Sequence, residues 1–192
     1  MSEIAVIGGG SFGTVIANII AENGHSVRFW MRSESLAKKV NAQHENPEYL
    51  PGYPLGARVV ATHNMAQAVR GSSVIFVAVP STSFRSVVRR IMEHAVPGVM
   101  LVSTTKGIEA GSFMLMSEVL KAEAPEAKIG VLSGPNLAKE IAASQLTGTV
   151  IASSQESVRS RIQELLKSET FRVYTNDDVF GIELGGSLKN IY

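Results

Sequence analysis

The chain has 192 residues, of which 45% are hydrophobic and 18% charged, and its formal net charge of +1 gives no electrostatic reason to expect nucleic acid as a partner. Cysteine is absent, which excludes disulfides, thiolate metal sites and a cysteine nucleophile. The longest apolar run, VIFVAV at 74–79, is too short to span a membrane, and the first residues carry no basic segment of a signal peptide. We therefore expect a cytoplasmic protein without stable membrane insertion.

Short runs rich in β-branched residues alternate with longer stretches of helical periodicity. The strand-like runs are 4–7, 26–30, 59–62, 74–79, 99–104, 128–133, 149–154 and 171–175, and the helical stretches are 11–23, 34–43, 83–95, 112–123 and 155–167. Several runs are apolar on both faces, as strands are when helices cover both sides of a sheet. The alternation predicts an α/β fold with a doubly wound, mainly parallel sheet of the Rossmann type.

Two segments depart from this alternation. Residues 46–56, NPEYLPGYPLG, contain three prolines and two glycines, and predict an ordered loop without regular secondary structure before the third strand. The segment 183–192, ELGGSLKNIY, keeps helical spacing despite two adjacent glycines. We expect Thr175, Asn176 or Asp177 to cap that last helix.

The turn after the first strand, GGGSFG at 8–13, matches the pattern G-x-G-x-x-G. In that pattern Gly8 makes a tight turn, Gly10 lets the backbone approach a pyrophosphate, and Gly13 lets the helix pack on the strand. The helix N-terminus then offers N–H groups and a positive dipole end to the phosphates, and Ser11 and Phe12 lie at its mouth. The position between a strand and a helix predicts a dinucleotide-binding loop rather than a purely structural turn.

The end of the second strand, FWMRSE at 29–34, indicates which dinucleotide is preferred. An acidic residue there would bind the ribose 2′-hydroxyl group, whereas arginine would accept a 2′-phosphate. Arg32 is a bidentate phosphate binder, which favours NADP(H). Glu34 leaves NAD(H) open, and a solvated surface charge is the alternative role for Arg32.

Polar and glycine-bearing turns follow the other strands, and in a doubly wound sheet ligands bind at the carboxyl ends of the strands. The fourth strand ends before Pro80, at a turn that either borders the cofactor or is a plain connector. Lys106 follows the fifth strand. Gly134 and Asn136 follow the sixth, where Asn136 is predicted to cap the next helix. A surface lysine and a helix cap explain each turn singly, but together they predict a site for a small anionic substrate.

In the last helix, Gly185 and Gly186 lie one turn before Lys189 and on the same face. Two missing side chains would clear room beside the ammonium group of Lys189. The alternative is close packing of the helix, with Lys189 reaching solvent. These residues alone leave both interpretations open.

Six motifs occur together and in order: GGGSFGT at 8–14, NPEYLPG at 46–52, VAVPS at 77–81, TTKGIE at 104–109, LSGPNLAKEI at 132–141 and ELGGSLKNI at 183–191. On these motifs, which extend over essentially the whole chain, the sequence resembles the N-terminal part of the bacterial NAD(P)-dependent glycerol-3-phosphate dehydrogenases. The resemblance implies an oxidoreductase that interconverts dihydroxyacetone phosphate and sn-glycerol 3-phosphate, usually for phospholipid synthesis. It also implies a Rossmann domain over 1–175 and, over 176–192, the start of a helix leading into a helical substrate domain that this chain lacks, so the chain is expected to be inactive alone.

The resemblance assigns roles to individual residues. The expected cofactor-binding residues are Gly8, Gly10, Ser11, Phe12, Gly13, Arg32, Lys106 and Ala138. The expected substrate-binding residues are Lys106, Gly134, Asn136 and Lys189. Lys189 is the expected catalytic residue, and no metal ion is expected. The chain departs from the family at Asn136, where serine or threonine is common, and at Ser33, where a basic residue or histidine is common.

The chemistry implied is hydride transfer to the ketone carbon, with Lys189 giving a proton to the carbonyl oxygen. Lys106, if close, would lower the pKa of Lys189, because like charges disfavour each other. The expected partner is a phosphorylated small molecule, and the resemblance allows a homodimer of the full-length protein. Two alternatives remain: a related ketoacid or hydroxyacid reductase, and a module that only binds a dinucleotide.

Overall fold

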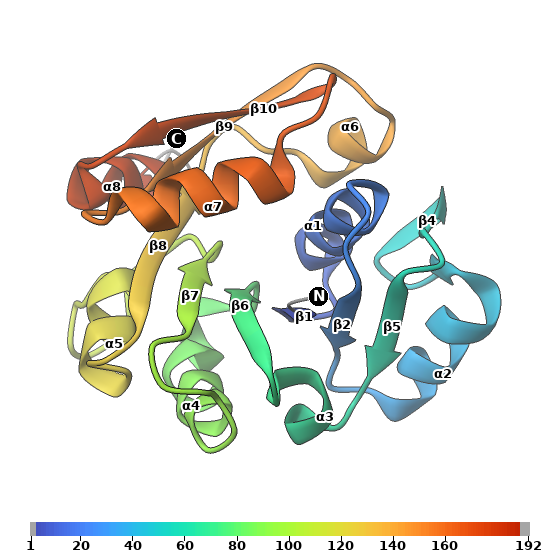
Figure 1. Cartoon of the computed structure of the whole chain (residues 1–192), viewed down its shortest axis with the longest axis horizontal. Coiled ribbons are helices and arrows are strands. Elements are labelled where there is room, and N and C mark those ends of the chain that lie inside the picture. Colours follow the sequence, from blue (N-terminus) through green and yellow to red (C-terminus); the bar gives the residue numbers. More distant parts are fainter. Residues whose placement is uncertain (1–2, 189–192) are drawn as a thin grey trace.

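Eight strands form one mixed sheet in a computed structural model that describes residues 3–188 (Figure 1). In sequence order the strands are β1 Glu3–Ile7, β2 Val27–Trp30, β5 Val59–Thr62, β6 Ser72–Val77, β7 Met100–Ser103, β8 Lys128–Ser133, β9 Thr147–Ala152 and β10 Phe171–Asn176. Their spatial order is β5-β2-β1-β6-β7-β8-β9-β10. Every neighbouring pair is parallel except β8 and β9. The predicted doubly wound, mainly parallel sheet is confirmed.

Helices connect the strands and cover both faces of the sheet (Figure 1). They are α1 Ser11–Glu22, α2 Glu34–Gln43, α3 Met65–Val69, α4 Ser81–Met92, α5 Met116–Glu123, α6 Ala138–Ala142, α7 Glu156–Leu166 and α8 Val179–Leu188. The five-residue helix α3 was not predicted, because so short a helix shows no helical period, whereas α6 is the helix predicted after Asn136. No helix within residues 3–188 is long and apolar enough to cross a membrane.

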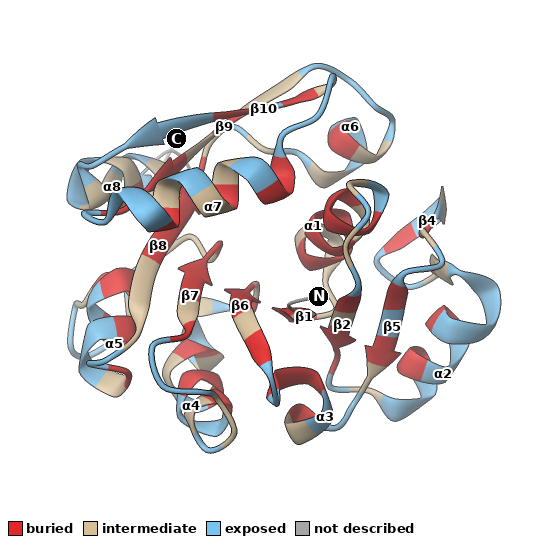
Figure 2. Ribbon diagram, in the orientation of Figure 1, coloured by how far each residue is buried: buried red, intermediate tan, exposed pale blue. Residues whose placement is uncertain are grey.

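The core consists of two layers, one on each face of the sheet. Alternate residues of β1 divide between them: Ile4 and Val6 belong to the layer with α1, α2 and α7, and Ala5 and Ile7 to the layer with α3, α4 and α5. The central strands are therefore buried on both faces, as Figure 2 shows for β6 and β7. This explains why their sequences are apolar without alternation.

The prediction of a loop without regular structure over 46–56 is wrong. Strand β3, Glu45–Asn46, and strand β4, Leu50–Pro54, form a small antiparallel hairpin outside the main sheet. Only two residue pairs define the ladder, Glu45 with Pro54 and Asn46 with Leu50, so few ladder N–H groups are needed. Proline is tolerated in such an isolated two-stranded edge.

Two predicted helix caps are also wrong. The Asp178 side chain accepts a hydrogen bond from the Gly181 N–H group at 2.8 Å and so caps α8, one residue beyond the predicted candidates 175–177. Helix α6 begins after Leu137, which makes no side-chain cap. The side chain of Asn136 instead donates to the Thr149 hydroxyl group in β9. In both places, contacts made by the folded chain decide which side chain caps the helix.

Candidate functional site

The carboxyl ends of five parallel strands meet at one edge of the sheet. These are β2, β1, β6, β7 and β8, and the turns that follow them are the ones that the sequence singled out. The chain winds in opposite directions from the centre, with β2 on one side of β1 and β6 on the other. Ligands of doubly wound sheets bind at this point, where the strand order reverses.

The glycines of the turn after β1 serve different purposes. A Cβ atom on Gly8, whose φ is +127°, would overlap the Ala78 carbonyl oxygen, and one on Gly13 would overlap the Gly8 carbonyl oxygen. Both glycines are therefore required by close packing. A Cβ atom on Gly10 would meet nothing within 4 Å among the described residues. This open space next to the start of α1 fits the phosphates of a dinucleotide.

The electrostatics of the α1 N-terminus favour an anion. Gly10 is the N-cap residue and makes no side-chain cap, and the first turn of α1 carries no acidic residue. The first N–H groups of a helix have no partner within the helix, and the aligned peptide dipoles place partial positive charge there. These features suit the pyrophosphate of NAD(P)H, which would supply a hydride to a substrate beside it.

Two pockets at this edge share Phe12, Thr104 and Lys106. One, of about 180 Å³, is bordered by the turn 78–80 that follows β6, and the other, of about 260 Å³, is bordered by Leu132 and Asn136. A larger hollow of about 1000 Å³ lies beside β5 and α3, but none of the predicted site residues lines it. We place the candidate site by the strand ends and not by pocket size.

Lys106 and the turn after β8 are joined by a direct contact. The Lys106 ammonium group donates a hydrogen bond of 2.9 Å to the Gly134 carbonyl oxygen. A Cβ atom on Gly134 would lie 3.1 Å from the Gly148 carbonyl oxygen, so β9 leaves little room for a side chain there. The Asn136 Oδ1 atom is buried and accepts no hydrogen bond from any described residue. The structure thus gathers Phe12, Lys106, Gly134 and Asn136, with a buried acceptor directed at no protein donor within residues 3–188.

At the end of β2, Glu34 is paired and Arg32 is exposed. Glu34 pairs with Lys38 at 2.9 Å, and the hydrogen bond from Lys38 lowers the pKa of the Glu34 carboxyl group. Ser33 is the N-cap residue of α2 and accepts the Leu36 N–H group at 3.1 Å. Arg32 is exposed between them and the strand.

Helix α8 is fixed against this edge by three contacts that the sequence did not reveal. The Ser187 hydroxyl oxygen accepts the Gly107 N–H group at 3.1 Å. The Glu183 carboxylate, only 3% exposed, accepts the Ser117 N–H group at the start of α5, and burial raises its pKa. Gly186 packs so closely on Ser133 that a Cβ atom would overlap the Ser133 hydroxyl group.

These contacts bear on whether the paired glycines serve close packing of the helix or leave room beside Lys189. A Cβ atom on Gly186 would displace the Ser133 hydroxyl group, whereas a Cβ atom on Gly185 would meet nothing within 4 Å among the described residues. Lys189 lies outside the described residues, so its predicted role stays a prediction. Ala138, another predicted cofactor contact, is the first residue of α6, which lies beside α1.

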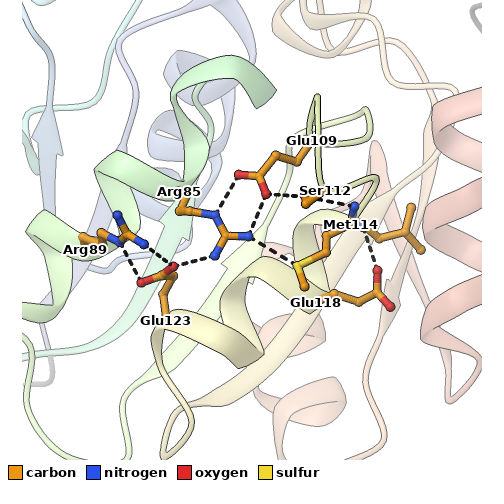
Figure 3. Close-up of polar contacts among 8 residues, drawn as sticks. Arg85, Arg89, Glu109, Ser112, Met114, Glu118 and Glu123 are labelled. Atoms are coloured by element: carbon orange, nitrogen blue, oxygen red, sulfur yellow. Dashed lines mark hydrogen bonds and ion pairs between the residues drawn. The ribbon is translucent and has the colours of Figure 1, made fainter.

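A network of charged side chains supports the loop that carries Lys106 (Figure 3). Arg85 of α4 donates two hydrogen bonds, of 2.8 and 2.6 Å, to the Glu109 carboxylate and a further one to Glu123 of α5. Arg89 also binds Glu123, and Ser112 donates to Glu109. The four-residue spacing of the two arginines on a helix is the sequence signal that could have suggested such a cluster.

A doubly wound sheet, a glycine turn between β1 and α1, and polar turns converging at the point of strand reversal define a Rossmann-type dinucleotide-binding domain. The model of the NAD-dependent glycerol-3-phosphate dehydrogenase N-terminus matches residues 3–159. The chain belongs to this family.

Individual relatives agree with this assignment. The chain is 53% identical over 190 residues to glycerol-3-phosphate dehydrogenase [NAD(P)+] of Teredinibacter turnerae, covering 99% of the chain and 56% of that protein. It is 53% identical over 191 residues to the enzyme of the same name from Pseudomonas entomophila, covering 98% and 55%. The crystal structure of glycerol-3-phosphate dehydrogenase from Coxiella burnetii superposes with a TM-score of 0.94 at 35% identity, covering 99% of this chain and 58% of that one. The chain spans about half the length of these relatives.

Proposed function

We propose that the protein is the dinucleotide-binding part of an oxidoreductase that interconverts dihydroxyacetone phosphate and sn-glycerol 3-phosphate. The observation that carries this proposal is the juxtaposition of Phe12, Lys106, Gly134 and Asn136 beside the open space at Gly10. The family of the chain supports it, since its relatives bear the name of that enzyme. Supply of glycerol 3-phosphate for phospholipid synthesis, in the cytoplasm, is part of the proposal.

The proposed division of labour follows the geometry. The turn 8–13 and Ser11, Phe12, Arg32 and Ala138 bind the cofactor, with NADP(H) favoured because Glu34 is engaged by Lys38. Lys106, held against Gly134, contributes positive charge between cofactor and substrate. The turn of Gly134 and Asn136 binds the substrate, and the unpartnered Asn136 Oδ1 would accept a hydrogen bond from a hydroxyl group.

Lys189 is proposed to exchange a proton with the substrate oxygen as negative charge develops there. Residues 1–175 are proposed as the dinucleotide-binding domain, and 176–192 as the segment that joins it to a helical substrate domain. A homodimer of the full-length protein, without nucleic acid as a partner, completes the proposal.

The test measures binding and turnover separately. Calorimetric titration of this chain with NADPH and NADH gives the cofactor affinities. Turnover of dihydroxyacetone phosphate is then measured in a longer protein, which contains this sequence and extends to the full length of the relatives. We expect turnover with dihydroxyacetone phosphate but not with 2-ketoacids, and we expect Lys189→Ala to abolish turnover while NADPH still binds. Reduction of 2-ketoacids, or binding without any turnover, would instead support one of the two alternatives.

A further inference from the structure

Asn46, in the hairpin of β3 and β4, is fully buried and uses its whole amide group. Its nitrogen donates to the Gly9 carbonyl oxygen at 2.9 Å and to the Thr14 hydroxyl oxygen at 2.8 Å. Its oxygen accepts the Tyr49 N–H group at 3.3 Å, which closes the hairpin turn. One side chain therefore joins the hairpin to the glycine turn, 37 residues away.

The connection continues through Thr14 into the glycine turn. The Thr14 hydroxyl group, buried like Asn46, donates to the Gly10 carbonyl oxygen at 2.8 Å while it accepts from Asn46. In the opposite direction, the Ser11 hydroxyl group donates to the Tyr49 carbonyl oxygen at 2.7 Å. The carbonyl groups of two successive glycines are thus held in place, that of Gly9 by Asn46 and that of Gly10 by Thr14, whose N–H group also donates to it at 2.9 Å.

Because the peptide bond is planar, a contact that fixes a carbonyl group also fixes the direction of the N–H group in the same peptide unit. No described peptide bond is cis, and in a trans peptide the C=O and N–H bonds point in opposite directions. Holding the Gly9 carbonyl group toward the hairpin turns the Gly10 N–H group away from it. Holding the Gly10 carbonyl group toward Thr14 fixes the Ser11 N–H group in the same way. These N–H groups belong to the α1 N-terminus, where Gly10 adjoins open space.

We propose that Asn46 is a positioning residue for the cofactor site, and that the hairpin 45–54 is a structural part of that site. Asn46 acts through Gly9 and Thr14 to aim the N–H groups of Gly10 and Ser11 at the pyrophosphate of the dinucleotide. The inference rests on the proposed function, because it requires a pyrophosphate at α1. It also explains the residue type: an aspartate at this position would set its carboxylate against the Gly9 carbonyl oxygen and lack the two donated hydrogen bonds.

The test uses this chain and a comparison of two ligands. Calorimetric titration with NADPH, which contains the pyrophosphate, is compared with titration by adenosine 2′-monophosphate, which lacks it. We expect Asn46→Ser to weaken NADPH binding roughly tenfold, the scale of one or two lost hydrogen bonds, and Thr14→Val to weaken it by a smaller factor, because the residue 14 N–H group still holds the Gly10 carbonyl group. Neither variant should change the binding of adenosine 2′-monophosphate. Thr14→Ser, which keeps the hydroxyl group, should bind NADPH like the unmodified chain.

Asn18→Ser is the matched control, since the Asn18 amide oxygen accepts the Gly56 N–H group at 2.8 Å and ties the end of the hairpin segment to α1 one turn beyond Thr14. NADPH affinity in this variant should be unchanged. The inference is overturned by normal NADPH affinity in folded Asn46→Ser, by equal weakening of both ligands, or by an equal loss in Asn18→Ser. If Asn46→Ser does not fold, the Thr14 pair decides by the same measurements. Failure of the unmodified chain to bind either NADPH or NADH would overturn the proposed function itself and this inference with it.

Discussion

Adjacent glycines in α8 differ in what a methyl group would meet. A Cβ atom on Gly186 would displace the hydroxyl group of Ser133 in β8, whereas Gly185 faces open space among the described residues. The helix pays in backbone entropy for both glycines. Only at Gly186 does the close approach of helix and strand offset that loss, and the approach also lets Ser187 accept the Gly107 N–H group.

We predict different effects for alanine at these two positions. Gly186→Ala should raise the free energy of unfolding less than Gly185→Ala does, because its methyl group forces the Ser133 hydroxyl group to rotate away. Gly185→Ala should raise the free energy of unfolding by roughly 0.5–1 kcal/mol, because alanine is the better helix former. Urea unfolding followed by circular dichroism measures both. Equal effects of the two substitutions would show that α8 does not pack on Ser133 as described.

Glu183 gives α8 a dependence on pH. Burial raises the pKa of its carboxyl group above the ordinary 4.5, against the opposing hydrogen bonds from Ser117. Because the folded state holds the proton more tightly than the unfolded state, the contribution of Glu183 to stability is greatest below pH 4.5 and declines as pH rises through the folded-state pKa. The stability of the unmodified chain relative to Glu183→Gln should therefore fall with rising pH. Urea unfolding midpoints of both proteins across this pH range test the prediction. If the unmodified chain became more stable relative to the variant as pH rises, the raised pKa would be contradicted.

Ion pairs of Arg85 in α4 hold the loop 104–115 and the helix α5. Their dependence on pH is opposite to that of Glu183. Hydrogen bonds from Arg85, and then from Ser112, lower the pKa of the Glu109 carboxyl group to about 2. Since the folded-state pKa is depressed, the stabilisation is complete above pH 4.5 and is lost as pH falls toward 2. Because Lys106 lies three residues before Glu109, the same network supports the loop that carries Lys106.

We predict that Glu109→Gln lowers stability at pH 7 and that the difference from the unmodified chain disappears as pH falls from 4.5 toward 2. Hydrogen exchange should also become faster in residues 107–115 of this variant, since the loop loses the carboxylate charge and one of the two acceptor oxygens that Arg85 uses. Glu164→Gln is the control, because Glu164 forms an exposed pair with Arg161 within α7. Such surface pairs contribute little. A larger effect at Glu164 than at Glu109 would contradict the prediction.

Periodicity was sufficient to predict the elements that build the sheet, because strands buried on both faces and helices of several turns each leave a local pattern. It was not sufficient for the hairpin of β3 and β4, whose stability depends on bonds from Asn46 to Gly9 and Thr14, far along the chain. The cap predicted at Asn136 was wrong for a similar reason. The Asn136 side chain, which the local sequence assigned to the helix cap, instead donates a hydrogen bond to Thr149, 13 residues later.

The candidate site shows the same limit. The fixed spacing of Gly8, Gly10 and Gly13 predicted a phosphate turn, in which close packing requires Gly8 and Gly13 while Gly10 adjoins open space. The contact of Glu183 with Ser117 spans 66 residues, and no local pattern indicates it. The position of Lys106 after a strand was enough to place it at this edge of the sheet. Its hydrogen bond to Gly134 could not be predicted without knowing that β7 and β8 are neighbours.

At the scale of the whole molecule, the reversal of β9 brings the start of that strand beside the end of β8. Thr149 thereby contacts Ser133 and Asn136. It borders the candidate site on the side of β8, and α1 borders it on the side of β1. The site thus joins residues that lie far apart in the sequence, from Phe12 to Thr149. A ligand bound there would stabilise the fold as a unit, because the elements it contacts extend from β1 to β8.

This linkage provides a test of cofactor preference. A ligand that binds only the folded state adds RT ln(1 + [L]/Kd) to stability, about 2.7 kcal/mol at a hundredfold excess over Kd. We expect NADPH to raise the thermal midpoint of this chain more than NADH at the same concentration, because Arg32 is exposed at the end of β2 while Glu34 pairs with Lys38. Arg32→Ser should remove most of the advantage of NADPH and leave the shift with NADH nearly unchanged. Arg172→Ser, at an exposed arginine of β10, is the control and should preserve both shifts. Equal shifts by the two cofactors in the unmodified chain would assign Arg32 to the surface and remove the preference for NADP(H).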